Sequence, residues 1–210
     1  MNNYIDALNW RYAVKKFDPS KRISKENLDA LKTSVQLSAS SYGLQPYKIL
    51  IVQDDEVKAK MKDAGFDQTQ FTDASEIFVF AHQTDFGAEL VDSYIAIAEK
   101  TKDLESGSLE GYSNMMKNAL LDLPQEGKAA WAAKQAYLAL GNLLSAAAAY
   151  KIDACPMEGF NSESFNEILN LKDKNLHAAA VVAVGYRSED DKHQHDKKVR
   201  RPQTELIKTI

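Results

Sequence analysis

Cysteine is almost absent from the sequence: the 210 residues include only Cys155. One cysteine cannot form an intramolecular disulfide, so we interpret Cys155 as a small buried side chain in a protein of a reducing compartment, the cytoplasm. Long apolar runs are absent too, since no stretch approaches the ~18 apolar residues of a membrane span and the N-terminal segment MNNYIDALNWRY has no apolar core like that of a signal peptide. These absences predict a cytoplasmic protein with no membrane partner.

The sequence also has no surplus of basic over acidic residues and no glycine-rich phosphate-binding motif. Its 26 Lys and Arg against 30 Asp and Glu give a formal net charge of -4, which argues against nucleic acid as a partner, because that binding requires a surplus of positive charge on one face. The nine glycines are scattered, and neither GxGxxG nor GxxxxGKS/T occurs. A Rossmann or P-loop nucleotide site is therefore not expected, and any anion must be held by a local cluster of basic side chains.

What the sequence does contain is enough apolar residues for a core. With 44% hydrophobic and 27% charged residues, the chain fits one compact domain spanning residues 1–210. Apolar runs of strand length occupy residues 48–53, 76–83 and 177–186. We expect these runs to pair in one small central sheet.

Helical patterns occupy most of the remaining chain. Residues 2–10 predict a short helix, and Ser24 has the residue type and the position of an N-cap before a second helix. Three further helices are predicted over residues 87–103, 109–123 and 126–152. The order of these elements predicts an α+β class in which helices flank the sheet and dominate.

The last of these helices is apolar on almost every side. Its larger and polar residues share one face: Trp131, Gln135, Leu138, Asn142 and Ser145. A helix of this kind is buried, so we expect a central helix or one shared with a second subunit. The segment CPMEGF that follows, Cys155 to Phe160, places proline, an acid and glycine together, which predicts a bend that is neither helix nor strand.

Two basic clusters lie near opposite ends of the chain. One is RYAVKK, with Arg11, Lys15 and Lys16, and the other is KKVRRP, with Lys197, Lys198, Arg200 and Arg201. The simpler interpretation is that both are solvated charge runs. The alternative is a phosphate site, because the planar fork of an arginine suits phosphate oxygens. The four histidines are assigned no catalytic role, and no metal is expected.

Five segments together carry a resemblance to a known family. They are RYAVKKFDPSKRIS (11–24), LSASSYGLQPYKILIV (37–52), DQTQFTDAS (67–75), CPMEGF (155–160) and KKVRRP (197–202). In this order and spacing they resemble the FMN-dependent NAD(P)H nitroreductase family, in the branch with the oxygen-insensitive bacterial nitroreductases and dihydropteridine reductase. The resemblance implies a nitroreductase-like α+β fold and an intertwined homodimer that binds two FMN molecules between its subunits.

The resemblance also implies which residues bind the FMN phosphate. Arg11, Lys198 and Arg200 match the residues that hold it, and Tyr12 and Ala13 belong to the same part of the cofactor site. Charge pairing with a phosphate dianion explains why cationic side chains occur here without glycine loops.

The flavin ring is expected beside two further matched segments. Lys15 matches the lysine near flavin N1 and O2, and it also borders the nicotinamide site. The bend CPMEGF is expected to bring the backbone N–H groups of Glu158 and Gly159 to flavin N5 and O4, with Pro156 fixing the approach of the chain.

Two other matched loops depart from the family pattern. Ser40 and Ser41 match serines that reach the FMN of the partner subunit, but Gly43 and Tyr47 replace an asparagine and a tryptophan in that loop. Asp67 stands where the family commonly has asparagine. A carboxylate there accepts a hydrogen bond from flavin N3-H but cannot donate one to a carbonyl oxygen.

Three further residues are candidates for contact with the flavin or its substrate. Gln135 either faces the flavin or is satisfied within the core. Gln70 and Phe71 are assigned to the substrate and nicotinamide face, although aromatic residues at such positions usually pack in the core.

The function implied is FMN-dependent oxidation of NADH or NADPH, with hydride passing through flavin N5 and no catalytic side chain. The acceptors are nitroaromatic, quinone or pterin-like molecules, reduced by two electrons in a ping-pong cycle. Three alternatives stay open: another flavin chemistry on the same fold, a flavin-binding or regulatory dimer without enzymatic activity, and a small basic-tailed binding protein. The C-terminal arm, RPQTELIKTI (201–210), is expected to wrap onto the partner subunit.

Overall fold

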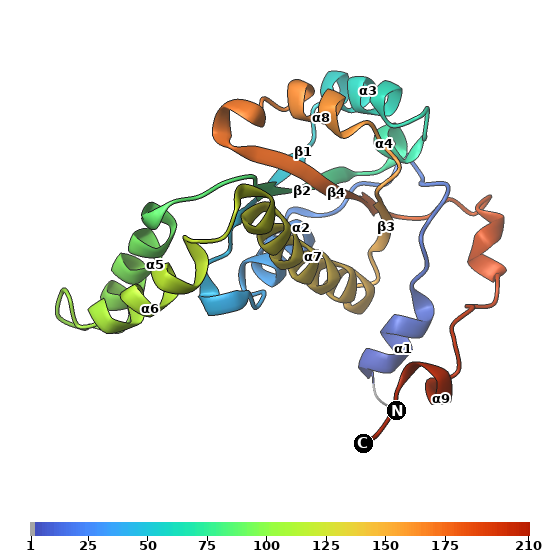
Figure 1. Ribbon diagram of the computed structural model, residues 1–210. Coiled ribbons are helices and arrows are strands. Elements are labelled where there is room, and N and C mark those ends of the chain that lie inside the picture. The colour runs from blue at the N-terminus through green and yellow to red at the C-terminus, as the bar shows by residue number, and fades with distance from the viewer. Residues whose placement is uncertain (1–2) are drawn as a thin grey trace.

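The computed structural model, which describes residues 3–210, has a four-stranded antiparallel sheet between two layers of helices (Figure 1). The strands are β1 (Tyr47–Val52), β2 (Glu76–Gln83), β3 (Asp153–Met157) and β4 (Leu176–Gly185). Their spatial order is β1-β2-β4-β3, so β1 and β3 are the edge strands. Each neighbouring pair is antiparallel.

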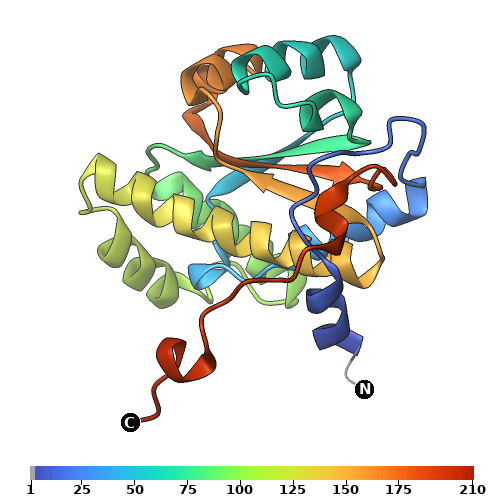
Figure 2. The ribbon, with the colours of Figure 1, turned by 90° about the vertical axis from the view of Figure 1, so that its right-hand side faces the viewer.

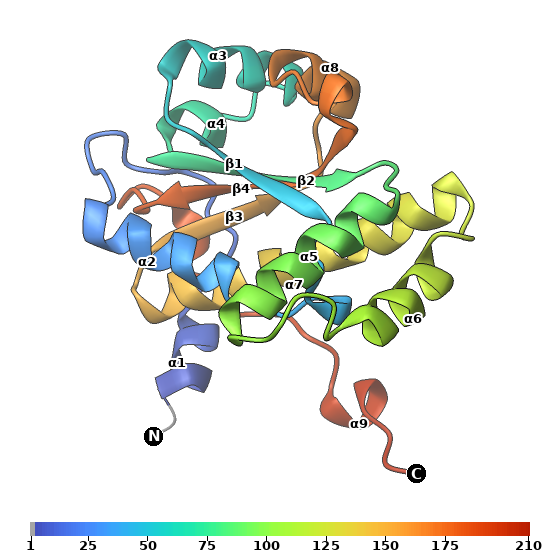
Figure 3. The same cartoon turned by 90° about the vertical axis from the view of Figure 1, so that its left-hand side faces the viewer.

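Helices cover both faces of this sheet. In chain order they are α1 (Asn3–Trp10), α2 (Lys25–Gln36), α3 (Asp55–Ala64), α4 (Gln70–Asp73), α5 (Ala88–Thr101), α6 (Glu110–Leu120), α7 (Gln125–Ala149), α8 (Ser162–Ile168) and α9 (Gln203–Leu206), with short 3-10 helices η1 (Ser41–Gly43), η2 (Lys172–Lys174) and η3 (Lys192–His195). Helices α3, α4 and α8 lie over one face, and α2 and α7 lie over the other (Figures 1 and 3). Helices α5 and α6 form a pair beside the sheet. No helix within residues 3–210 combines the length and the apolar character needed to cross a membrane.

The two faces explain the continuous apolar run from Ile77 to Ala81 within β2. Ile77 and Val79 belong to the core cluster under α3, α4 and α8, while Phe78 and Phe80 belong to the cluster against α2 and α7. Because successive side chains of a strand point to opposite faces, a strand covered on both sides is apolar at every position.

Most of the predicted elements are confirmed. The three predicted strands correspond to β1, β2 and β4 within about one residue at each end, as local patterns allow. Ser24 is the N-cap of α2, with its side chain accepting from the Asn27 backbone N–H at 3.2 Å. The predicted helix over residues 2–10 corresponds to α1, although residue 2 lies outside the described residues. The three long helical stretches correspond to α5, α6 and α7.

The predicted bend at CPMEGF is wrong in its first half, because Asp153–Met157 forms β3. Val14 N–H donates to Ala154 C=O at 3.4 Å on the side of β3 that faces away from β4. Backbone groups along a strand alternate in direction, so the nitrogen of Pro156 also points away from β4. An edge strand tolerates proline at such a position, because no ladder hydrogen bond is lost.

Helix α7 is less buried than its sequence predicted. It packs against β2 and α2, and the alanines and leucines on that side are buried. Tyr137 and Leu138 on the other side are 40% and 54% exposed. Contacts with the rest of residues 3–210 therefore leave these two side chains substantially exposed.

The end of the C-terminal segment extends away from the rest of the protein. Residues 197–210 are exposed, including the apolar Leu206, Ile207 and Ile210. Figure 2 shows this segment, in red, leaving the sheet and its helices and ending in α9.

Candidate functional site

The structure brings the two basic clusters together. Arg11 and Lys15 from the N-terminal part and Lys198 and Arg200 from the C-terminal part line one cavity of about 350 Å³. Lys198 Nζ donates to the backbone oxygen of Arg11, which is 187 positions away in sequence. The two clusters are therefore neighbours in the fold, although Lys15, Lys16, Lys198 and Arg200 remain exposed to solvent.

The cations in this cavity lack a partner of opposite charge. Within residues 3–210, Arg11, Lys198 and Arg200 form no ion pair, and Arg11 Nε is buried with no hydrogen-bond partner. Burial and the nearby charge of Arg200 lower the pKa of Arg11, and burial followed by the charges of Arg11 and Arg200 lowers the pKa of Lys198. Asp196 also lines the cavity, but it pairs with His193 at 2.8 Å. An anion in the cavity would relieve this repulsion and supply the missing acceptor.

Asp191 holds the N-terminal side of this cavity in place. It is 2% exposed, and its Oδ2 accepts hydrogen bonds from Lys15 N (2.8 Å), Lys16 N (3.1 Å) and the Tyr12 hydroxyl (3.0 Å). Burial by itself raises the pKa of Asp191, but these hydrogen bonds outweigh it, so the pKa lies below the ordinary value for aspartate. In the sequence Asp191 is one acid in the run EDDK, and nothing local distinguishes it from its neighbours.

An ion pair between Arg187 and Asp153, which the sequence did not reveal, supports the N-terminal segment that carries Arg11. Arg187 contacts Asp153 at 2.6 Å, and Asp153 is almost fully buried. The Arg187 guanidinium also lies over the rings of Trp10 and Tyr12, 4.4 and 4.6 Å from their centroids. These contacts join the start of β3 to the segment that carries Arg11.

The outer edge of β3 presents free backbone donors next to the basic cavity. Ala13 pairs with Ala154 in the parallel sense, so Lys15 lies further along toward the end of β3. By the alternation described above, the N–H of Glu158 also points away from β4. Within residues 3–210 no partner is found for the N–H groups of Glu158 and Gly159. Two donors at one end of the site and cations at the other suit a ligand with an acceptor-rich ring and an anionic tail.

The loop that carries Asp67 is tied to the same turn. Phe66 and Asp67 both adopt left-handed backbone conformations (φ 57° and 56°). Gln68 Nε2 then donates to the backbone oxygens of Gly65 at 2.9 Å and of Gly159 at 2.7 Å. The Asp67 side chain is exposed and makes no hydrogen bond to another described residue. A Cβ added at Gly159 would meet only Gln68, at 3.8 Å, so no packing within the chain requires glycine there.

Three other assigned residues do not meet in this cavity. Gln135 Oε1 accepts from Ser41 N at 2.8 Å, and its Nε2 donates to Trp131 C=O at 3.1 Å. Gln135 is buried with both ends of its amide satisfied, so the structure favours the core interpretation over contact with a flavin. Ser40 Oγ accepts from the Gln45 backbone N–H at 3.1 Å. Neither Ser40 nor Ser41 lines the cavity around Arg11 in the same chain.

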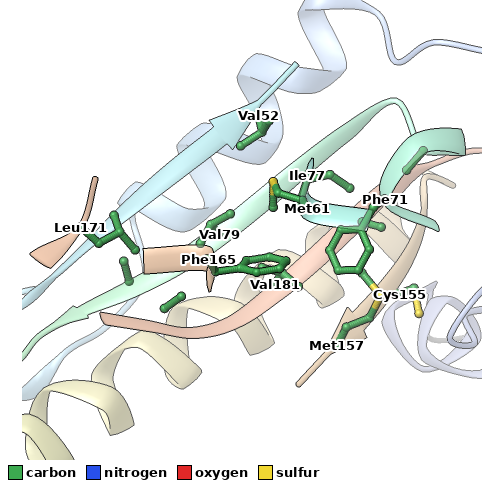
Figure 4. Close-up of a cluster of buried hydrophobic side chains, with 14 of the residues drawn as sticks. Val52, Met61, Phe71, Ile77, Val79, Cys155, Met157, Phe165, Leu171 and Val181 are labelled. Atoms are coloured by element: carbon green, nitrogen blue, oxygen red, sulfur yellow. The ribbon is translucent and has the colours of Figure 1, made fainter. Parts of the chain in front are cut away.

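The assignment of Phe71 to a substrate face is corrected by its burial. Phe71 is 0% exposed, and its ring lies edge-on to that of Phe165, with centroids 5.5 Å apart. Figure 4 shows the two rings within the core cluster between α3, α8 and the sheet. Gln70 is buried as well. The first two residues of α4 are therefore buried in the interior, whereas Thr72 and Asp73 are half-buried.

Cys155 is buried, as predicted from its isolation in the sequence. Burial raises the pKa of its thiol, and the charges of Lys15 and Arg11 only partly oppose this effect. A buried thiol with a raised pKa is a poor nucleophile. Within residues 3–210, no group of three or more His, Cys, Asp or Glu side chains is placed to hold a metal ion.

Comparisons with known proteins agree on one family. The model of the Nitroreductase family matches residues 8–186. A protein of Staphylococcus haemolyticus, provisionally named an NAD(P)H nitroreductase, is 33% identical over 214 residues, which cover 98% of this chain and 96% of that protein. The major NAD(P)H-flavin oxidoreductase of Aliivibrio fischeri is 34% identical over 194 residues, covering 89% of each chain.

A solved structure shows the same fold. A protein of Exiguobacterium sibiricum, provisionally named a nitroreductase and solved in complex with FMN, matches with a TM-score of 0.84 at 17% identity. The match covers 100% of this chain and 98% of that one.

Proposed function

The chain belongs to the nitroreductase family, and we propose that it works as follows. It is an oxidoreductase that uses FMN and takes electrons from NADH or NADPH. Its acceptors are electron-poor molecules such as nitroaromatics, quinones or pterin-like compounds, and each cycle reduces the acceptor by two electrons in a ping-pong sequence.

The convergence of Arg11, Lys198 and Arg200 on one cavity supports this proposal most directly. These side chains would hold the FMN phosphate, and the buried Arg11 Nε without a partner is a donor that a phosphate oxygen would satisfy. The lowered pKa values of Arg11 and Lys198, together with the lack of an ion pair to either side chain within residues 3–210, fit a dianion.

The end of β3 and the segment before it would hold the ring. FMN, when bound, supplies the two-electron redox chemistry. The N–H groups of Glu158 and Gly159 would donate to acceptor atoms of the ring and orient it, while Lys15 would supply positive charge beside it. Asp191 keeps the Lys15 backbone in position through its hydrogen bond, and Gln68 does the same for Gly159.

We also propose that the active form is a homodimer in a reducing compartment such as the cytoplasm. Three features support a second subunit: the exposed apolar side of α7, the exposed apolar residues of the C-terminal arm, and the separation of Ser40 and Ser41 from the cavity of their own chain. In the dimer the Ser40–Ser41 loop would serve the FMN bound mainly by the partner. The single buried cysteine fits a reducing compartment.

The proposal is tested with the absorption spectrum of the purified protein after incubation with FMN and removal of free cofactor. We expect bound-flavin bands that disappear on anaerobic addition of NADH or NADPH and return when a quinone or nitroaromatic is added. If the bands remain after NADH and NADPH have each been added, over the time that an enzymatic turnover takes, the protein binds flavin but has no reductase activity. A protein that retains no flavin at all would contradict the proposal.

A further inference from the structure

The turn after β3 is held from two directions by side chains of other elements. Tyr137 of α7 donates its hydroxyl hydrogen to Glu158 Oε1 at 2.8 Å, while Gln68 Nε2 donates to Gly159 C=O at 2.7 Å from the side of α3. A cavity of about 250 Å³ adjoins the first contact and is lined by Tyr137, Leu140, Pro156, Met157, Glu158 and Ala180. The turn is therefore clamped between the helical layers on the two faces of the sheet.

The contact between Tyr137 and Glu158 has a fixed direction. Burial, and then the hydrogen bond to Glu158 and its charge, raise the pKa of Tyr137 to about 12. At neutral pH Tyr137 is therefore always the donor and the Glu158 carboxylate the acceptor. Hydrogen bonds to an ionised group are stronger than those between neutral groups, so this one can hold the Glu158 side chain even near the surface.

We propose that Tyr137 is a positioning residue for the cofactor turn, acting through Glu158. With its carboxylate held toward α7, Glu158 keeps its backbone N–H directed to the outer edge of β3, beside the segment of Ala13 and Lys15. Tyr137 thereby orients two main-chain donors without touching the cofactor itself. This inference rests on the proposed function, because it takes the outer edge of β3 as the place of the flavin ring.

The experiment compares Tyr137→Phe with Tyr150→Phe, a control in which the same atom is removed at the C-terminal end of the same helix. Tyr150 is exposed and makes no side-chain hydrogen bond within residues 3–210. Glu158→Ala and Glu158→Gln complete the set, because glutamine keeps an acceptor oxygen for the Tyr137 hydroxyl and alanine does not.

Two quantities are measured on each variant. One is the FMN dissociation constant of the apoprotein, from the quenching of flavin fluorescence. The other is amide hydrogen exchange in the apoprotein at Phe160 and Asn161, whose N–H groups bond to Glu158 C=O at 3.0 Å and to Ala64 C=O at 2.9 Å. Exchange at these amides reports the order of the turn without any cofactor.

For Tyr137→Phe we expect faster exchange at both amides and FMN binding weakened on the order of threefold to tenfold, as for the loss of the hydrogen bond to Glu158. The longer contact of the same hydroxyl with Ala179 C=O, at 3.4 Å, is lost as well. Tyr150→Phe should match the wild type in both. Glu158→Gln should keep the slow amide exchange of the wild type, and Glu158→Ala should exchange as fast as Tyr137→Phe. The double variant Tyr137→Phe/Glu158→Ala should exchange no faster and bind FMN no more weakly than either single variant, because the two residues act as one unit.

Two results would overturn these ideas, and they differ. If Tyr137→Phe keeps both the exchange rates and the FMN affinity of the wild type, Tyr137 does not position the turn, although FMN binding stands. If the wild-type apoprotein binds no FMN, the proposed function itself fails, and the assignment of this turn to the cofactor fails with it.

Discussion

Asp191 offers the sharpest test of how the site is held together. Its Oδ2 accepts three hydrogen bonds, from Tyr12, Lys15 and Lys16, and its Oδ1 accepts one from His193 N at 3.1 Å. In Asp191→Asn one of these oxygens becomes an NH₂ group. Whichever way the amide is turned, that group faces an N–H or O–H donor, so the substitution removes a charge and leaves at least one buried donor unsatisfied.

The expected loss of stability follows from these two effects. Hydrogen bonds to a charged group contribute about 1.5–3 kcal/mol, and an unsatisfied buried donor costs about 1–3 kcal/mol. Since the contributions of neighbouring hydrogen bonds are not additive, we expect Asp191→Asn to lower the free energy of unfolding by roughly 2–4 kcal/mol. The segment carrying Arg11 and Lys15 should loosen at the same time, so FMN should bind more weakly.

The pH dependence gives an independent check with a definite sign. The pKa of Asp191 is lowered in the folded protein, so its contribution is present above the unfolded pKa of about 3.9 and is lost as the pH falls through the lower folded value. The stability difference between wild type and Asp191→Asn should therefore be constant between neutral pH and about pH 5, and should shrink only in more acidic solution.

The assay is urea unfolding followed by circular dichroism, at one fixed protein concentration. The matched control is Asp190→Asn, because the neighbouring Asp190 carries an exposed ion pair with Lys16 and such pairs contribute about 0–1 kcal/mol. If Asp191→Asn unfolds at the same urea concentration as Asp190→Asn, the role assigned to the buried carboxylate is refuted.

Three further predictions concern the cofactor and the subunit contact. Arg200→Ala should weaken FMN retention on dialysis far more than Arg201→Ala, since only Arg200 lines the basic cavity; equal retention by both variants would contradict the phosphate site. Asp67 is proposed to lie near the flavin ring, so Asp67→Asn, which removes a negative charge, should raise the reduction potential of the bound flavin; an unchanged midpoint potential would show that Asp67 does not approach the ring. Removal of residues 203–210 should weaken the dimer in analytical ultracentrifugation, whereas a dimer of full stability would rule out a wrapping arm.

The sequence by itself determined the elements whose signals are local. The continuous apolar run of β2 and the serine cap of α2 depend on neighbouring residues, so both could be read from the sequence and both are present. The same holds for the family, because five short segments in the right order carry it. Those segments also pointed to Arg11, Lys198 and Arg200 as residues that meet at one phosphate, and the structure places all three around one cavity.

Only the tertiary structure decided which residues are buried and which backbone groups stay free. Pro156 sits in an edge strand because β3 has a neighbouring strand, β4, on one side and only the isolated Ala13–Ala154 bridge on the other. A proline-containing segment carries no local sign of such an arrangement. In the sequence Asp191 and Phe71 are likewise indistinguishable from other acidic and aromatic residues. Only the folded structure shows that both are buried. Burial and long-range hydrogen bonds depend on residues far apart in sequence, and a local pattern contains no information about them.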